Sequence, residues 1–300
     1  MKPGYDKPLY LLAFDHRGSF QKELVPEPER VADAKRVIYE AFLEVAGPGP
    51  LDDVGILVDE QFGADIARSA KEAGYALAMP AERSGQAEFD FEYGRDFDEH
   101  IEAFDPDFVK VLVRHNPDDP GASRARQIDR LAVLSYWLRG SGRKLMVELL
   151  VPPTPAQLEA FRGNIGDYDS ELRPVLMLEA IGELQNGGVE PDIWKIEGLD
   201  RRADYARMAE QARSGGRDRV SCIVLGRGAD EDRVLNWLVQ SAGLPGYIGF
   251  AVGRTLWWNE LRAYTAGRLP RAVAVRRIAE NFARLIDAYT LARVPARLAA

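Results

Sequence analysis

The sequence predicts a closed barrel of eight parallel strands with helices outside it, the TIM or (β/α)8 fold of the α/β class. Short apolar runs, many β-branched and flanked by Gly or Pro, recur along all 300 residues. Longer segments with helical spacing of apolar residues separate these runs. A chain of this length can hold two ordinary domains, but an α/β barrel commonly uses about 250 residues as one. We therefore expect a single barrel domain over residues 1–300.

Eight segments are expected to form the strands. They are Leu9–Asp15, Val54–Glu60, Ala76–Glu82, Phe108–Arg114, Lys144–Val151, Asp192–Glu197, Val220–Gly226 and Tyr247–Gly253. Amphipathic segments such as Pro28–Ala46 and Ser123–Arg139 lie between them. A final helix, about Leu269–Leu291, is expected to close the barrel or to contribute to an oligomer surface. A doubly wound open sheet is the alternative, but no G-x-G-x-x-G turn follows the first strand, and eight strands suit closure better.

Composition narrows the functional classes. A formal net charge of −8 argues against a general nucleic-acid surface, because phosphate neutralisation needs clustered Lys and Arg. A single cysteine, Cys222, excludes an internal disulfide and is expected to be a buried thiol. There is no signal-like apolar segment at the start and no apolar run of about 18 residues. We expect a cytoplasmic, homo-oligomeric protein with a small-molecule partner and no contact with membranes.

Polar residues gather where the predicted strands end, which is where barrel enzymes place their active sites. They are Asp15, His16 and Arg17 after the first strand, Asp59 and Glu60 after the second, Glu82 after the third, Lys110 and Arg114 on the fourth, Glu148 on the fifth, Lys195 and Glu197 on the sixth, Arg227 after the seventh and Arg254 after the eighth. Strand alternation directs Lys110, Glu148 and Lys195 into the barrel. Two lysines and a glutamate are therefore expected to meet in one cavity.

Such a lysine suggests amine catalysis. In mid-strand it loses solvation, and a neighbouring cation penalises its charged form further, so its pKa is expected to fall toward neutrality. A neutral amine attacks a ketone to give an iminium, which stabilises the carbanion left when the adjacent C–C bond breaks. Glu148 can then shuttle protons to and from the carbinolamine and the substrate hydroxyl. The alternative is that Lys110–Glu148 or Lys195–Glu197 are interior ion pairs without catalytic consequence.

Two Gly-Arg pairs predict an anion site. Gly226-Arg227 ends the seventh strand, and Gly253-Arg254 ends the eighth just before a helical segment. Phosphate sites in barrels are often built from these two loops, with help from a helix N-terminus. The arginines would supply charge-assisted hydrogen bonds. Taken singly, either pair is better explained as a turn with a solvated arginine, but the two together favour an anion site.

No metal cofactor is expected, although one alternative involves a metal. Oxygen ligands for Mg²⁺ or Mn²⁺ are available from Asp15, Asp59, Glu60 and Glu82, with His16 beside them. The chain has three histidines and no paired-His spacing, which disfavours a zinc-dependent aldolase.

The segment Arg83–Phe97 is rich in aromatic and acidic residues and follows the third strand. It is either a lid that contacts the substrate or a polar loop whose aromatics pack on the barrel rim. Trp137, Trp257 and Trp258 are expected to pack in the core or at an interface.

The motifs carry a family resemblance. LLAFDHRGSF, GILVDEQFG, PAERSGQAEFDFEYG, FVKVLVRHNPD, MVELLVP, DIWKIEGLDRR, IVLGRG and GFAVGRTLWW resemble segments of the 5-dehydro-2-deoxyphosphogluconate aldolases of myo-inositol catabolism, over nearly the whole chain. Similar domains are often fused behind a sugar kinase. No kinase segment is present here, so we expect a free-standing aldolase.

A more distant resemblance suggests which lysine reacts. FDHRG, VKVLV, MVELL, IWKIEG and GFAVGR are similar to motifs of the class I tagatose-bisphosphate aldolases, in which the strand-six lysine forms the imine. That resemblance implies the imine role for Lys195, with Lys110 and Glu148 as neighbours and Asp15 and His16 at the base of the site. The pattern departs at His16, where the tagatose enzymes carry glutamine.

The resemblance implies an aldehyde-lyase that needs no cofactor. Its substrate would be 5-dehydro-2-deoxy-D-gluconate 6-phosphate, cleaved to dihydroxyacetone phosphate and malonate semialdehyde through a Schiff base on Lys195. Arg227 and Arg254 would hold the phosphate, and Arg114 or Arg17 the carboxylate. The alternatives are another ketose phosphate, such as tagatose bisphosphate or a sulfosugar phosphate, or a metal-dependent aldolase. A non-catalytic sugar-phosphate regulator is a further alternative, but it would not need a desolvated lysine.

Overall fold

Eight parallel strands form a closed barrel in the computed structural model, which describes residues 2–24, 27–47 and 53–293. Each strand pairs with the next along the chain, and the eighth pairs with the first. The strands are β1 (Leu9–Ala13), β2 (Val54–Leu57), β3 (Ala76–Pro80), β4 (Phe108–Arg114), β5 (Lys144–Leu150), β6 (Ile193–Glu197), β7 (Ser221–Leu225) and β8 (Tyr247–Val252). The predicted TIM barrel is therefore confirmed.

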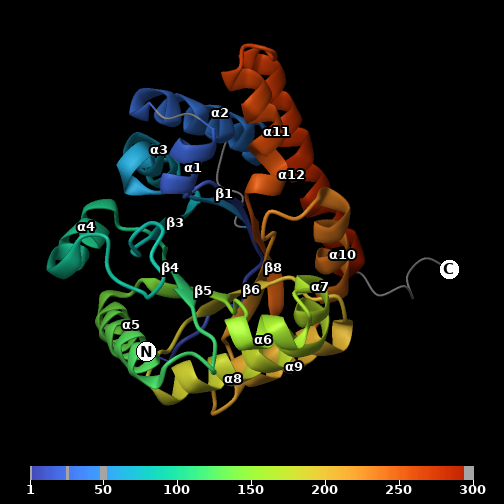
Figure 1. Ribbon diagram of the computed structural model, residues 1–300. Coiled ribbons are helices and arrows are strands. Elements are labelled where there is room, and N and C mark those ends of the chain that lie inside the picture. The colour runs from blue at the N-terminus through green and yellow to red at the C-terminus, as the bar shows by residue number, and fades with distance from the viewer. Residues whose placement is uncertain (1, 25–26, 48–52, 294–300) are drawn as a thin grey trace.

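Helices surround this ring of strands (Figure 1). They are α1 (Gly18–Glu23), α2 (Pro28–Ala46), α3 (Glu60–Glu72), the 3-10 turn η1 (Gly94–Asp96), α4 (Phe97–Phe104), α5 (Gly121–Ser141), α6 (Pro155–Ala160), α7 (Ile165–Asp167), the π-helical turn η2 (Tyr168–Leu172), α8 (Arg173–Asn186), α9 (Arg202–Arg213), α10 (Glu231–Ser241), α11 (Arg254–Thr265) and α12 (Arg271–Arg293). Within the described ranges, none of these helices is both long and apolar enough to cross a membrane.

Alternation along the strands divides the core into two layers. Val109, Val111 and Val113 of β4 belong to the layer between strands and helices, which also contains the buried thiol of Cys222. Other apolar side chains, such as Met146 of β5 and Ile193 of β6, belong to a separate cluster inside the barrel. Polar residues on the inward-facing positions are thus the ones that can reach a site at the barrel's C-terminal end.

Several strands are shorter than predicted. β1 ends at Ala13, β2 at Leu57 and β3 at Pro80, so Asp15, Asp59 and Glu82 lie in the loops that follow them. At β2 the reason is local, because the side chain of Asp59 accepts a hydrogen bond from Phe62 N at 2.9 Å and caps α3. The sequence predicts strands that are too long here, because polar loop residues follow the apolar runs directly and nothing in the sequence marks the strand ends.

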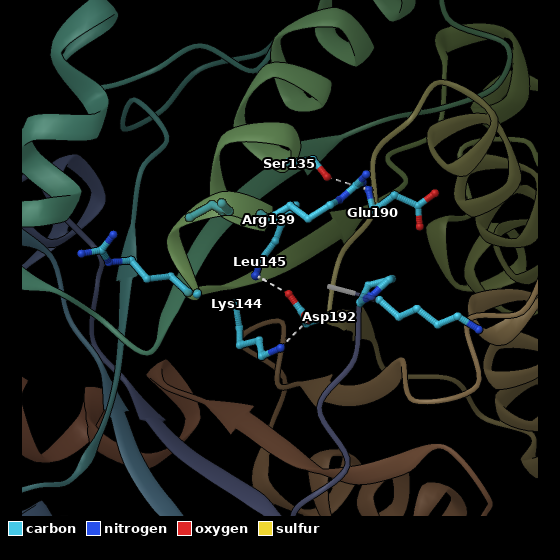
Figure 2. A pocket seen from close by; sticks show the side chains of 11 residues that line it. Ser135, Arg139, Lys144, Leu145, Glu190 and Asp192 are labelled. Atoms are coloured by element: carbon cyan, nitrogen blue, oxygen red, sulfur yellow. Dashed lines mark hydrogen bonds and ion pairs between the residues drawn. The ribbon is translucent and has the colours of Figure 1, made fainter.

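The N-terminal end of the barrel is held by Asp192, just before β6 (Figure 2). Its carboxylate accepts hydrogen bonds from Leu145 N at 2.9 Å and Gly4 N at 2.7 Å, and from Lys144 Nζ at 3.1 Å. A small pocket here is lined by several cations, but the carboxylate contacts serve to join the N-terminal segment to β5 and β6. The opposite end, where the strands finish, is left for the polar residues described next.

Candidate active site

Three carboxylates converge on one buried ammonium. The Nζ atom of Lys110, on β4, lies 2.9 Å from Asp15 Oδ2, 2.8 Å from Glu82 Oε1 and 2.8 Å from Glu148 Oε2. These partners come from the loops after β1 and β3 and from β5, so closure of the barrel brings them together. Lys110 is 2% exposed, which makes this an interior charge cluster rather than a surface one.

Lys195 joins the cluster through Glu148. Its Nζ atom lies 2.9 Å from Glu148 Oε2, the same oxygen that contacts Lys110. The register explains the contact, because Glu148 of β5 and Lys195 of β6 are direct neighbours in the sheet. The two lysines and the glutamate thus meet inside the barrel, where alternation placed them.

The expectation of a lowered lysine pKa is wrong for Lys110. Burial favours the neutral amine, but Asp15, Glu148 and Glu82 outweigh it and raise the pKa of Lys110 well above its ordinary value. Burial would also raise the pKa of Asp15, yet Lys110 and Lys195 hold that pKa well below its usual range. Asp15 and Glu82, in the loops after β1 and β3, add negative charge that the pattern of β4 alone does not reveal. Lys110 and Asp15 are therefore a fixed charge pair.

The two glutamates of the cluster differ. At Glu148, burial is opposed by Lys110 and Lys195, and their attraction lowers its pKa. At Glu82, burial outweighs the attraction of Lys110 and Arg17, so its pKa is raised. Carboxyl groups whose environments move their pKa values apart suit different roles in acid–base chemistry.

His16 lies beside this cluster and against α11. Its ring packs edge-on against Trp257, with centroids 5.3 Å apart, and its Nδ1 atom is buried without a hydrogen-bond partner in the described part of the chain. Burial lowers the pKa of His16 to about 4, with Asp15 opposing and Lys35 adding to the effect. The imidazole is therefore neutral at pH 7.

Two cavities adjoin the cluster. The larger, about 920 Å³, is lined by Gly226, Arg227, Gly253 and Arg254 among others. The smaller, about 350 Å³, is lined by Asp15, Arg17, Glu82 and Lys110 among others. Both are lined by His16, Arg114, Glu148 and Lys195. Lys195 thus lies in the wall that the two cavities share.

The smaller cavity carries two arginines. Arg17 donates to the Glu82 backbone oxygen at 2.7 Å and pairs with Glu92 at 2.9 Å. Arg114 donates to the backbone oxygen of Gln86 at 2.6 Å. These contacts fix the loop 83–97 over the cavity, and its buried Phe89 and Phe91 pack on the barrel rim. For these two aromatics, the interpretation of the segment as a loop whose aromatics pack on the barrel rim is correct.

The two Gly-Arg pairs line the larger cavity, and their arginines have different partners. Arg227 is held between Glu197, at 2.9 Å, and Asp169, at 2.6 Å. Arg254 pairs with Glu23 at 2.7 Å and stacks over Trp258, with 4.0 Å from its guanidinium carbon to the ring centroid. Trp258 also lines the cavity, whereas the sequence predicts a core or interface position for it.

Gly253 belongs to the second Gly-Arg pair of the predicted anion site. A Cβ atom there would lie 2.3 Å from Ala13 O, so the close approach of β8 and β1 requires glycine. Gly253 directly precedes α11, whose N-terminus has no side-chain cap among the described residues. Leu256 N already donates to Gly253 O at 2.8 Å, so the amides of Arg254 and Thr255 are the ones that an anion could use.

Two of the oxygen ligands considered for a metal lie elsewhere. Asp59 forms an ion pair with the fully buried Lys35, and Glu60 contacts Nδ1 of His100 at 2.9 Å. Glu197, proposed as a partner of Lys195, instead binds Arg227. Asp169 was missed, because it lies 58 residues before Arg227 on η2 and no motif marks it.

Comparison with solved structures supports the fold. A Schiff base-forming fructose-1,6-bisphosphate aldolase matches 91% of this chain and 93% of its own, with a TM-score of 0.56 and 16% identity. Protein Cgl0159 of Corynebacterium glutamicum matches 95% and 88%, with a TM-score of 0.61 and 17% identity. At such low identity these similarities establish the barrel alone.

Comparison with protein sequences establishes the family. No curated protein sequence matches the chain. A family model described as uncharacterized protein conserved in bacteria matches residues 2–293, nearly the whole chain. On that match the chain belongs to the bacterial family DUF2090.

Proposed function

We propose that this protein is an aldolase that forms a Schiff base through Lys195. The observation that carries the proposal is the buried Nζ atom of Lys195, 2.9 Å from Glu148 and in the wall of both cavities. Among the described residues, one carboxylate lies within ion-pair distance of Lys195 and three lie around Lys110. A nucleophilic amine must be neutral, and the raised pKa of Lys110 holds that lysine as an ammonium, which leaves Lys195 for the role.

The fold and the sequence resemblance support the same chemistry. The fructose-1,6-bisphosphate aldolase that shares the barrel is described as Schiff base-forming. The motif similarity to class I tagatose-bisphosphate aldolases assigns the imine to the strand-six lysine, which is Lys195 on β6. In this proposal Lys110 stays an ammonium and supplies fixed positive charge beside the reacting amine.

The proposed substrate is 5-dehydro-2-deoxy-D-gluconate 6-phosphate, which carries an anion at each end. Its phosphate would bind in the larger cavity, at Arg254 and the uncapped N-terminus of α11, with Gly226 and Arg227 beside it. Its carboxylate would enter the smaller cavity toward Arg17 and Arg114. The ketone then falls between them, where Lys195 lines both cavities.

The proposed reaction begins when Lys195 adds to the C5 ketone. Glu148, in contact with the amine, exchanges protons with the carbinolamine as water leaves. A base then takes the proton of the C3 hydroxyl, the C3–C4 bond of the iminium breaks, its electrons form the enamine, and C3 departs as the aldehyde of malonate semialdehyde. Protonation at C4 and hydrolysis release dihydroxyacetone phosphate and free Lys195.

A product assay tests the proposal. Purified protein is incubated with 5-dehydro-2-deoxy-D-gluconate 6-phosphate, tagatose 1,6-bisphosphate or a sulfosugar phosphate, each with and without EDTA. We expect dihydroxyacetone phosphate and malonate semialdehyde from the first compound, at the same rate with the chelator. Cleavage of another ketose phosphate alone would overturn the substrate, and loss of activity in EDTA would favour the metal-dependent alternative.

A further inference from the structure

We propose that Glu82 is a second catalytic residue, which takes the proton of the hydroxyl beside the breaking C–C bond and returns it to the carbon left behind. The inference rests on the Schiff-base aldolase proposed above. Glu82 follows β3, where it forms a backbone bridge with Phe91, and is 5% exposed. It lines the smaller cavity together with Lys195.

The two oxygens of Glu82 have different surroundings. Oε1 lies 2.8 Å from Lys110 Nζ, which anchors the side chain. Oε2 is buried and has no hydrogen-bond partner in the described part of the chain. A buried carboxylate oxygen without a donor is costly, so a ligand that donates a hydrogen bond there would relieve the cost.

Other buried atoms around the same cavity also lack partners among the described residues. They are Nδ1 of His16, Nε of Arg17 and Nε2 of Gln86. Arg17 Nε and Gln86 Nε2 are donors and Glu82 Oε2 is an acceptor, and all three residues line the smaller cavity. In this proposal that cavity takes the C1–C3 fragment, which carries a carboxylate and a hydroxyl.

Among the three carboxylates around Lys110, Glu82 is the best suited to exchange a proton. Asp15 is held ionised, and Glu148 contacts both lysines through one oxygen, with its pKa lowered. Burial raises the pKa of Glu82, which brings it nearer to working pH, where a general base is most effective. Glu148 then exchanges protons with the Lys195 nitrogen and the carbinolamine, and Glu82 exchanges the proton of the hydroxyl on the departing fragment.

The step balances without any further reactant. Ionised Glu82 takes the C3 hydroxyl proton, the oxygen lone pair forms the aldehyde C=O, and the C3–C4 electron pair forms the C4=C5 enamine and neutralises the iminium. Protonated Glu82 then gives its proton to C4, which restores the iminium for hydrolysis. Glu82 ends the cycle ionised, as it began.

The test separates imine formation from bond cleavage. Glu82→Gln keeps the oxygen that faces Lys110 but removes the base. Borohydride trapping with dihydroxyacetone phosphate measures imine formation, and release of dihydroxyacetone phosphate from the keto-acid phosphate measures cleavage. Glu88→Gln is the matched control, because Glu88 lies on the same loop and pairs with Arg126 and Arg130 of α5.

We expect Glu82→Gln to be trapped within threefold of wild type but to cleave about 10²–10⁴-fold more slowly. Glu82→Asp should recover part of the cleavage, and Glu88→Gln should match wild type in both assays. Cleavage by Glu82→Gln within threefold of wild type would overturn the inference, as would a parallel loss of trapping and cleavage. Absence of any wild-type adduct would instead overturn the Schiff-base function itself.

Discussion

The Oε2 atom of Glu148 lies 2.9 Å from Nζ of Lys195, and both residues are buried inside the barrel. That oxygen also contacts Lys110, which two further carboxylates hold as an ammonium. One carboxylate thus links a permanently charged lysine to the lysine proposed as nucleophile. The charge state of both lysines therefore depends on this shared Glu148 oxygen.

Replacing Lys110 by Met should destabilise the fold. It leaves Asp15, Glu82 and Glu148 buried without their shared cation, and breaking a buried ion pair costs about 3–5 kcal/mol. Urea unfolding at pH 7 should show a loss of that size. The loss should shrink toward pH 5, because removal of the Lys110 cation should raise the pKa values of these carboxyl groups, which then bind protons in the folded state.

A control for this substitution is Lys71→Met, since Lys71 pairs with Asp105 and Asp107 at 3.3 Å near the surface. We expect it to cost less than about 1 kcal/mol. An equal loss from both variants would show that the Lys110 cluster is no more important to stability than a surface pair.

His16 should make stability depend on pH in a defined window. Its pKa is lowered to about 4, against 6.5 for an ordinary histidine, so between these values the unfolded chain binds a proton that the folded chain does not. Above pH 6.5 this difference does not lower the free energy of unfolding. As the pH falls below 6.5, the free energy of unfolding decreases by at most about 1.4 kcal/mol per pH unit. Urea unfolding at pH 7, 6 and 5 should show a steeper decline for wild type than for His16→Gln. Parallel curves would contradict a neutral His16 imidazole in the folded protein.

Replacing Arg254 by Leu should weaken binding of the substrate phosphate. A hydrogen bond to a charged group is worth about 1.5–3 kcal/mol, so KM should rise about tenfold or more with a smaller change in kcat. Arg268→Leu is the control, since Arg268 is exposed beyond α11. Equal KM values for the two variants would remove Arg254 from the phosphate site.

Replacing Gly253 by Ala should destabilise the barrel where β8 approaches β1. The new Cβ would lie 2.3 Å from Ala13 O, and overpacking of this kind costs about 1–3 kcal/mol. Gly140→Ala is the control, because a Cβ there would meet no atom of the described residues within 4 Å outside its own helix backbone, and the residue lies in α5. That variant should gain about 0.4–1 kcal/mol in thermal or urea unfolding. A loss from Gly140→Ala as large as that from Gly253→Ala would contradict the close-approach explanation.

The barrel was predictable because its signals are local. Apolar runs such as that of β4 and the helical spacing of α2 are each read within one segment, and both have the predicted bounds. Alternation within a strand likewise placed Lys110, Glu148 and Lys195 inward without knowledge of the tertiary structure.

The electrostatics of the site were not predictable in the same way. The raised pKa of Lys110 depends on Asp15, 95 residues away along the chain, and on Glu82, 28 residues away. The position of Arg227 depends on its ion pair with Asp169, which lies on a turn that no sequence motif marks. Such pairings are set by closure of the barrel, so a sequence pattern reveals the charged residues without revealing which of them meet.

Borohydride reduction in the presence of dihydroxyacetone phosphate, followed by peptide mass mapping, tests the central claim most directly. The expected result is one covalent adduct on Lys195, in the β6 peptide, and none in the Lys195→Met variant. The adduct should form equally well after treatment with EDTA. An adduct on Lys110, or no adduct together with activity that the chelator abolishes, would contradict a Schiff base on Lys195.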